Sequence, residues 1–187
     1  MEVLKRVVIK EELVELTKDY RKAILLNQFL YWSQRIRDFD TFIKEENKRM
    51  NNSDTDDKPI TLQRGWIYKS AEELIDETML GVSKQTIGRL LNDLCENKWL
   101  ERRRNPKYKW DKTYQYRVNL IKICHDLYNI GYILQDYKGD LRYILPCSNR
   151  ELHSNHEEHH DSVIGTTIPE ITTKTTTETN LHFLWEN

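Results

Sequence analysis

The longest regular pattern of apolar residues lies near the N-terminus. Between about Lys18 and Met50, apolar side chains recur at alternating steps of four and three residues, the spacing of one stripe on an α-helix. The stripe consists of Leu25, Phe29, Trp32, Ile36, Phe39 and Ile43. We therefore expect one long amphipathic helix. Its stripe could pack into the core of the domain or pair with a second copy of the chain in a homodimer, and the pattern leaves both open.

A second helical pattern begins after the polar run NNSDTDDK at residues 51–58, which favours an exposed loop. Ser70 and Glu73 have the spacing of a capping box, in which two side chains bond the free N–H groups at a helix start. The apolar positions that follow predict a helix over Ala71–Leu80. Gly81 suits the left-handed conformation that often ends a helix, so we expect the helix to stop there.

A third helix is predicted directly after this glycine. Ser83 is a good N-cap residue, and the helix should run to about Asn97. Its buried stripe consists of Ile87, Leu90, Leu91 and Leu94. Two helices joined by so short a turn with a glycine are typical of a helix-turn-helix.

Beyond the third helix the period changes from helical to alternating. Tyr114, Tyr116 and Val118 should face one way and the residues between them the other, which predicts a strand with one buried face. The segment Trp99–Arg104 can pair with this strand, and the basic run NPKYKWDK between them is about as long as a wing loop. The chain from Gly65 to Leu120 therefore predicts a winged helix-turn-helix.

The remaining regular segments flank this unit. Residues 66–68 form a short strand-like run, Asn119 could cap a helix to about Ile130, and residues 132–137 and 141–145 predict a second hairpin. We expect an α+β fold that is mainly helical: a winged helix-turn-helix preceded by the long amphipathic helix, in one domain over residues 1–145.

The composition changes from Pro146 onward. The stretch GTTIPEITTKTTTETN is rich in threonine and cannot bury enough apolar surface to offset its chain entropy, so residues 146–187 predict a disordered, flexible tail. The tail contains His153, His156, His159 and His160. Histidines can bind zinc or nickel, but no scaffold fixes their geometry, so we expect a solvated run and no metal site.

Charge is unevenly distributed along the chain. The net charge is −1 over 187 residues, which offers a phosphate backbone no overall attraction. Between Lys98 and Arg117, however, eight positive residues stand against two negative ones. This segment predicts an electrostatic contact with DNA.

The outward face of the third helix carries side chains that can read base edges. Opposite its buried stripe stand Gln85, Arg89 and Asn92, with Lys84 near the helix start. Arginine can bond bidentately to guanine, and glutamine or asparagine to adenine. We predict that these four residues read bases. Lys84 could equally bind phosphate, and an ordinary solvated helix face is the alternative for the whole set.

The basic residues of the predicted wing suit phosphates or the minor groove. They are Arg102, Arg103, Arg104, Lys107, Lys109 and Lys112. Alternation along the strand should place Arg103 on a different face from Arg102 and Arg104. Trp110 at the tip could stack against DNA, although packing on its own hairpin is the simpler interpretation.

Other classes of function lack support in the sequence. No stretch is apolar enough to span a bilayer and the first residues do not resemble a signal peptide, so we expect a cytoplasmic protein without a membrane partner. Cys95, Cys124 and Cys147 contain no closely spaced pair, which argues against a disulfide framework or a zinc ribbon. No phosphate-binding loop, HExxH helix or GxSxG elbow is present, so we expect no enzyme and no cofactor.

Four segments together resemble the N-terminal domain of replication initiators, or replisome organisers, of phages and plasmids of Gram-positive bacteria. They are LLNQFLYWSQR, WIYKSAEEL, GVSKQTIGRLLNDLCENKWLERR and TYQYRVNL, and the resemblance covers about Leu25 to Leu120. It implies a domain that binds double-stranded DNA and acts with replication proteins. Within the recognition-helix motif it also implies that Ser83 and Thr86 contact the DNA backbone beside the base-reading residues.

Transcription regulators share the recognition-helix pattern, so a winged-helix regulator is the first alternative. A module that retains the winged fold but binds another protein is the second.

Overall fold

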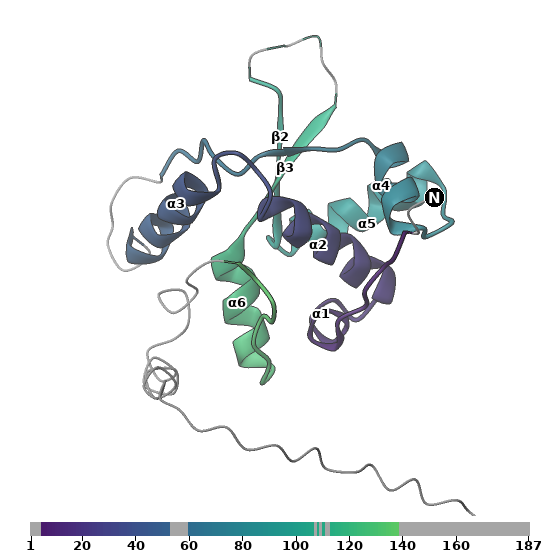
Figure 1. Ribbon diagram of the computed structural model, residues 1–187, viewed down its shortest axis with the longest axis horizontal. Coiled ribbons are helices and arrows are strands. Elements are labelled where there is room, and N and C mark those ends of the chain that lie inside the picture. The colour runs from purple at the N-terminus through teal and green to yellow at the C-terminus, as the bar shows by residue number, and fades with distance from the viewer. Residues whose placement is uncertain (1–4, 53–59, 107, 109, 111–112, 139–187) are drawn as a thin grey trace, which may run out of the picture. The chain divides into compact units, whose positions relative to one another are not determined.

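The computed structural model describes residues 5–52, 60–106, 108, 110 and 113–138. Within this part of the chain the fold is α+β and mainly helical, with an antiparallel sheet of strand order β1-β3-β2 (Figure 1). The helices are α1 (Glu11–Thr17), α2 (Tyr20–Ser33), α3 (Phe39–Asn52), α4 (Ala71–Thr78), α5 (Lys84–Glu96) and α6 (Leu120–Asn129). The strands are β1 (Ile67–Tyr68), β2 (Leu100–Arg104) and β3 (Tyr114–Val118).

The prediction of one long N-terminal helix is wrong, because α2 and α3 are separated by a turn at residues 34–38. At the end of α2 the Ser33 hydroxyl donates to the carbonyl of Leu30 at 2.8 Å and also bonds the Tyr137 hydroxyl, local bonding that competes with continuation of a helix. The next helix begins after Asp38, whose carbonyl accepts from the Phe42 N–H. A turn here lets Phe42 become fully buried.

The apolar stripe packs into the core of the domain. Leu25 and Phe29 are fully buried, and the later members of the stripe are partly buried against the same core. These later members are Trp32, Ile36, Phe39 and Ile43. Of the two interpretations of the stripe, the structure therefore supports core packing.

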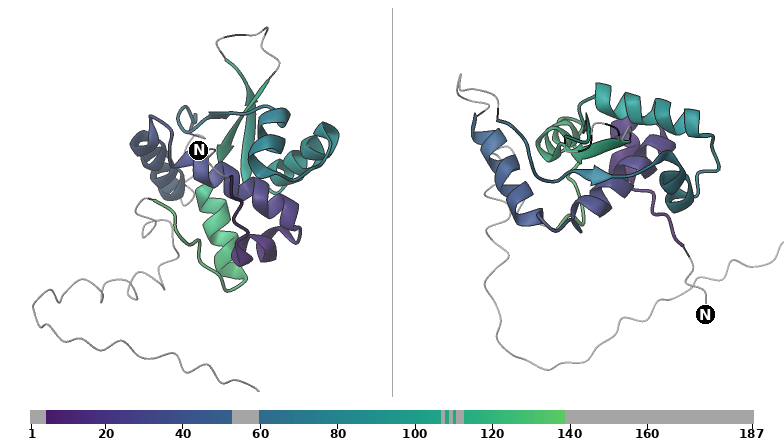
Figure 2. Two further views of the ribbon diagram at one scale, coloured as in Figure 1. Left: turned by 45° about the vertical axis from the view of Figure 1, so that its right-hand side comes forward. Right: turned by 90° about the horizontal axis from the view of Figure 1, so that it is seen from above.

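The α3 helix lies on one side of the β2–β3 hairpin, and α4 and α5 lie on the other (Figures 1 and 2). Its contact with the chain before β1 is close. Gly65 has a φ of +79°, and a Cβ placed there would lie 2.3 Å from the Phe42 ring. Both the backbone conformation and the proximity of the ring therefore require glycine at this position.

The α4 helix starts as predicted and ends earlier. Ser70 and Glu73 form the complete capping box, each side chain bonding the backbone N–H of the other. The helix stops at Thr78 because Met79, not Gly81, is the left-handed C-cap, with a φ of 52°. The Met79 N–H bonds the carbonyl of Ile75, which closes the last turn.

The α5 helix is confirmed, including its cap and its buried face. The Ser83 side chain accepts a hydrogen bond of 3.2 Å from the N–H of Thr86. The buried residues are Ile87, Leu90, Leu91 and Leu94. This face packs toward α2 and α4, so the opposite face of α5 is left outward.

The predicted β2–β3 hairpin is also confirmed, and one face of it enters the core. Tyr116 and Val118 are buried, and the Tyr116 ring lies 5.2 Å from the Phe29 ring of α2. The sequence predicted that only one face of β3 is buried. Its second face is buried too, because Arg117 is fully buried. The cause is α3, which covers this face and was not expected there.

The segment after β3 is confirmed only as far as α6. The Asn119 side chain caps this helix by accepting from the Lys122 N–H at 3.1 Å. The strand predicted over residues 132–137 is wrong, because Tyr137 bonds Ser33 and the Lys138 N–H bonds the side chain of Gln34 in place of a strand partner. The segment 141–145 and the tail 146–187 lie outside the described residues.

Candidate nucleic-acid interface

The exposed face of α5 carries the four predicted base-reading side chains. Gln85, Arg89 and Asn92 are all exposed on the side opposite the buried stripe. Lys84 is also exposed and forms an ion pair with Glu72 of α4, which lowers the pKa of the Glu72 carboxyl. The Arg89 side chain is exposed and has no hydrogen-bond or ion-pair partner among the described residues. Its guanidinium is therefore available to a ligand.

Two hairpin arginines lie on the same side as this face. The strand register pairs Arg102 with Tyr116 and Arg104 with Tyr114, so both arginines share the face of the sheet that continues into the core. Arg102 donates to the side-chain oxygen of Asn92 at 2.5 Å and lies 4.6 Å from the centre of the Tyr114 ring. Arg104 lies 5.0 Å from the centre of the same ring. The hairpin thus adds positive charge beside the exposed face of α5.

Arg103 lies on the opposite face of the hairpin, as the alternation predicted. Its Nε donates to Gln115 at 2.9 Å, and its guanidinium lies 4.0 Å from the centre of the Trp66 ring. These contacts hold the side chain partly buried on the side away from α5. Arg103 is therefore separated from Arg102 and Arg104 by the thickness of the sheet.

The last arginine of the basic segment is neutralised inside the protein. Arg117 is fully buried and forms ion pairs with Glu45, Glu46 and Glu101. The positive charge counted from Lys98 to Arg117 therefore does not all face solvent. Three further predicted contacts, Lys107, Lys109 and Lys112, lie outside the described residues.

An aromatic pair lies near the tip of the hairpin. The rings of Tyr108 and Trp110 are 5.8 Å apart, yet the two residues are 54% and 79% exposed. Packing of Trp110 on its own hairpin therefore covers little of its surface, and most of the indole stays open to solvent.

The two residues assigned by resemblance hold the start of α5. Ser83 and Thr86 join their hydroxyls at 3.0 Å, and Ser83 also accepts from the Thr86 N–H. Both contacts fix the first turn of the helix, where unpaired N–H groups carry partial positive charge. Their observed role is to cap the helix, and contact with a DNA backbone stays a prediction.

A groove of about 600 Å³ separates α5 from the hairpin and from the first turn of α4. Its wall includes Gly88 and Asn92 of α5, Arg102 and Tyr114 of the hairpin, and Ser70 before α4. From the sequence, Tyr114 was predicted only as part of the buried face of a strand, and neither it nor Gly88 was predicted as a site residue. The available signals were the position of Gly88 in the middle of a predicted helix and the position of Tyr114 two residues before the buried Tyr116.

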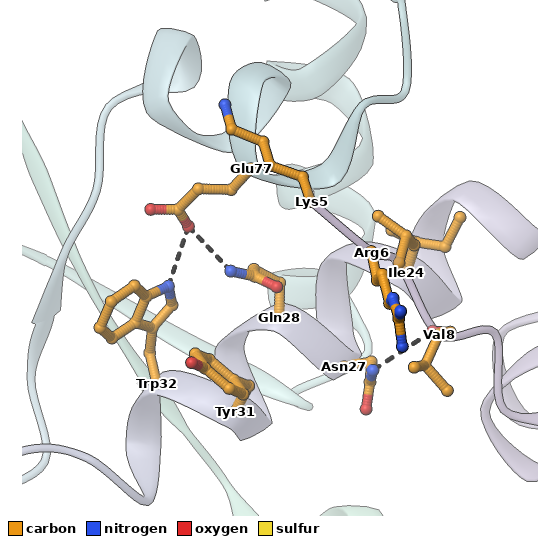
Figure 3. A pocket seen from close by; sticks show the side chains of 10 residues that line it. Lys5, Arg6, Val8, Ile24, Asn27, Gln28, Tyr31, Trp32 and Glu77 are labelled. Atoms are coloured by element: carbon orange, nitrogen blue, oxygen red, sulfur yellow. Dashed lines mark hydrogen bonds between the residues drawn. The ribbon is translucent and has the colours of Figure 1, made fainter. Parts of the chain in front are cut away.

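A second hollow, of about 390 Å³, lies away from this surface, between the chain at residues 5–8 and α2 (Figure 3). Glu77 points into it from α4 and accepts hydrogen bonds from Gln28 at 2.9 Å, from the Trp32 indole at 2.8 Å and from Lys69. Burial opposes the charge of Glu77, but these hydrogen bonds lower the pKa of its carboxyl below the usual value. The arrangement joins α2 to α4.

Thiol and metal chemistry find little support in the described part of the chain. Burial raises the pKa of both described cysteines, that of Cys124 to about 12, so the thiolate is scarce at neutral pH. No cluster of three or more histidine, cysteine or acidic side chains that could hold a metal occurs among the described residues. The four tail histidines lie outside them.

Among the described helices, none combines the length and the apolar character that a membrane crossing requires. Compared with protein-family models, with curated proteins and with solved structures, the chain matches none of them.

Proposed function

We propose that α4 and α5 form a helix-turn-helix, that β2 and β3 form its wing, and that the chain binds double-stranded DNA in a sequence-specific manner. The observation that carries this proposal is the hydrogen bond between Arg102 and Asn92, which joins the hairpin to the exposed face of α5. It brings the base-reading candidates and two phosphate-binding candidates onto one continuous surface.

In this proposal α5 enters the major groove, where each base pair presents a distinct pattern of donors and acceptors. Arg89 and Gln85 bond base edges, and Arg102 and Arg104 approach phosphates. Lys84 stays paired with Glu72 at the edge of this surface and meets a phosphate with its remaining N–H groups.

We further propose that this binding serves replication initiation on a phage or plasmid, with replication proteins as partners. Support comes from the resemblance, whose four segments fall in α2, in β1 and α4, in α5 and β2, and in β3. The role predicts repeated sites near an origin or within the gene of the protein. A single site that overlaps a promoter would instead favour a transcription regulator.

The test of DNA binding is a selection from random duplexes with the purified full chain. We expect a defined motif, and we expect Arg89→Ala to relax it. Arg35→Ala is the matched control, because it removes an equal charge at an exposed position in the turn after α2, outside the proposed surface. If no duplex is retained above background at low salt, the proposal is wrong.

A further inference from the structure

Gly88 occupies the middle of α5, where glycine destabilises a helix relative to alanine because it loses more backbone freedom on folding. The other glycines in the described part of the chain, Gly65, Gly81 and Gly131, all have a positive φ that explains their presence. Gly88 has helical geometry that any residue can adopt. Its backbone conformation therefore gives no reason for a glycine.

Packing within the protein gives no reason either. A Cβ placed at Gly88 would meet nothing within 4 Å, whereas at Gly65 it would collide with the Phe42 ring. A methyl group at position 88 would therefore fit the protein as it stands. The absent side chain instead keeps open a strip of helix backbone that faces outward.

This strip forms part of the groove between α5, the hairpin and the start of α4. The groove favours an anion. Arg102 lies in its wall and Arg104 lies close by on the same Tyr114 ring. The acidic residue of the wall, Glu72, is already paired with Lys84. The first turn of α4 is already capped by the Ser70–Glu73 box, so the attraction for an anion comes from the hairpin arginines.

We infer that Gly88 admits one strand of bound DNA, whose sugar–phosphate backbone enters this groove and lies directly against the backbone of α5. The inference rests on the proposed function, and it assigns the groove to the phosphate backbone while the outer face of α5 reads bases. A side chain at position 88 would occupy the space that the strand needs. Arg102, held by Asn92 and Tyr114, is placed to meet the phosphate from the other wall.

The test separates stability from binding. Gly88→Ala should raise the thermal midpoint of the full chain by roughly 2–4 °C, because alanine is the better helix former and finds open space. The same variant should lose about tenfold in affinity for the selected duplex, and Gly88→Leu should lose more, because each added group intrudes on a filled space. Thr41→Ala is the control: it also improves helix propensity at an exposed position, in α3 on the side of the hairpin away from α5 (Figure 1).

A scan of the duplex with single methylphosphonates identifies the contact. The parent protein should lose affinity when one particular phosphate is replaced. The Gly88→Ala variant should show no further loss from that same replacement. Binding of Gly88→Ala with parent affinity, while the parent binds its duplex, would overturn this inference and leave the proposed function standing. Failure of the parent to bind any duplex would overturn both.

Discussion

Arg117 of β3 and Glu46 of α3 form an ion pair in which both side chains are 0% exposed, with 2.5 Å between Nη1 and Oε1. The Arg117 Nε also donates to the carbonyl of Arg64 at 2.7 Å. Glu45 and Glu101 each lie 3.4 Å from the same guanidinium. The pair fixes α3 against the sheet face that is turned away from α5, and it removes one arginine from the candidate interface.

Loss of one partner from this pair should destabilise the protein severely. Arg117→Met leaves Glu46 buried with only the 3.4 Å contact to Arg49, and we expect a loss of about 3–5 kcal/mol in the free energy of unfolding. The double variant Arg117→Met with Glu46→Leu should recover much of that loss, because no fully buried charge is left without its partner. Urea titration measures both values. A single variant that costs less than about 1 kcal/mol would show that the pair does not fasten α3.

The Glu77 carboxyl should make stability depend on pH on the acid side. Its pKa is lowered in the folded protein, so its stabilising effect is present above the ordinary carboxyl value of 4.5 and is lost as the pH falls through the folded pKa. Glu77→Gln keeps one acceptor and removes the charge, so it should cost about 1–3 kcal/mol at pH 7. The gap between parent and variant should shrink as the pH falls below 4.5. If the difference in stability between parent and variant stays constant with pH, the effect comes from the shape of the side chain and not from its charge.

The elements that were predicted correctly are those determined by residues close together along the chain. The capping box at Ser70, the N-cap at Ser83 and the hairpin all follow from signals within a few positions, and each is present. At the break between α2 and α3, by contrast, Ser33 bonds Tyr137, which lies more than 100 residues away along the chain. Likewise, the alternation in β3 predicts that Arg117 lies on the second face of the strand. That this face is buried follows only from the position of α3, which the alternation does not give.

The fit of α3 on the chain before β1 should be sensitive to one methyl group. Gly65→Ala forces a non-glycine residue into a φ of +79° and places its Cβ against the Phe42 ring. We expect a loss of at least about 2 kcal/mol in the free energy of unfolding. Phe42→Leu combined with Gly65→Ala should recover the steric part. An unchanged urea midpoint for Gly65→Ala would contradict this close packing.

The outward face of α5 should control which DNA sequences bind. Arg89→Ala and Gln85→Ala should each weaken binding to the selected site by about 1–3 kcal/mol and relax the preference among sites. Binding to random duplex should change less, because base edges contribute little there. A repeat selection with each variant measures this. Recovery of the parent motif at parent affinity would remove α5 from the reading role.

The two faces of the hairpin should differ in their dependence on salt. Arg104 lies on the face shared with α5, whereas Arg103 is held on the other face by Gln115 and Trp66. If Arg104 contacts a phosphate, Arg104→Ala should make the slope of log affinity against log salt shallower by roughly 1, since one fewer counterion is released. It should weaken specific and random duplexes about equally, because a phosphate contact carries no sequence information.

Arg103→Ala is the matched variant, since it removes the same charge from the next residue of the same strand. It should lower the thermal midpoint through loss of its contact with Trp66 and leave the salt slope nearly unchanged. Fluorescence anisotropy over a series of salt concentrations measures both slopes. Equal slopes for the two variants would mean that DNA does not distinguish the faces of the hairpin. A loss for Arg104→Ala confined to the selected site would mean that the hairpin reads bases or groove shape.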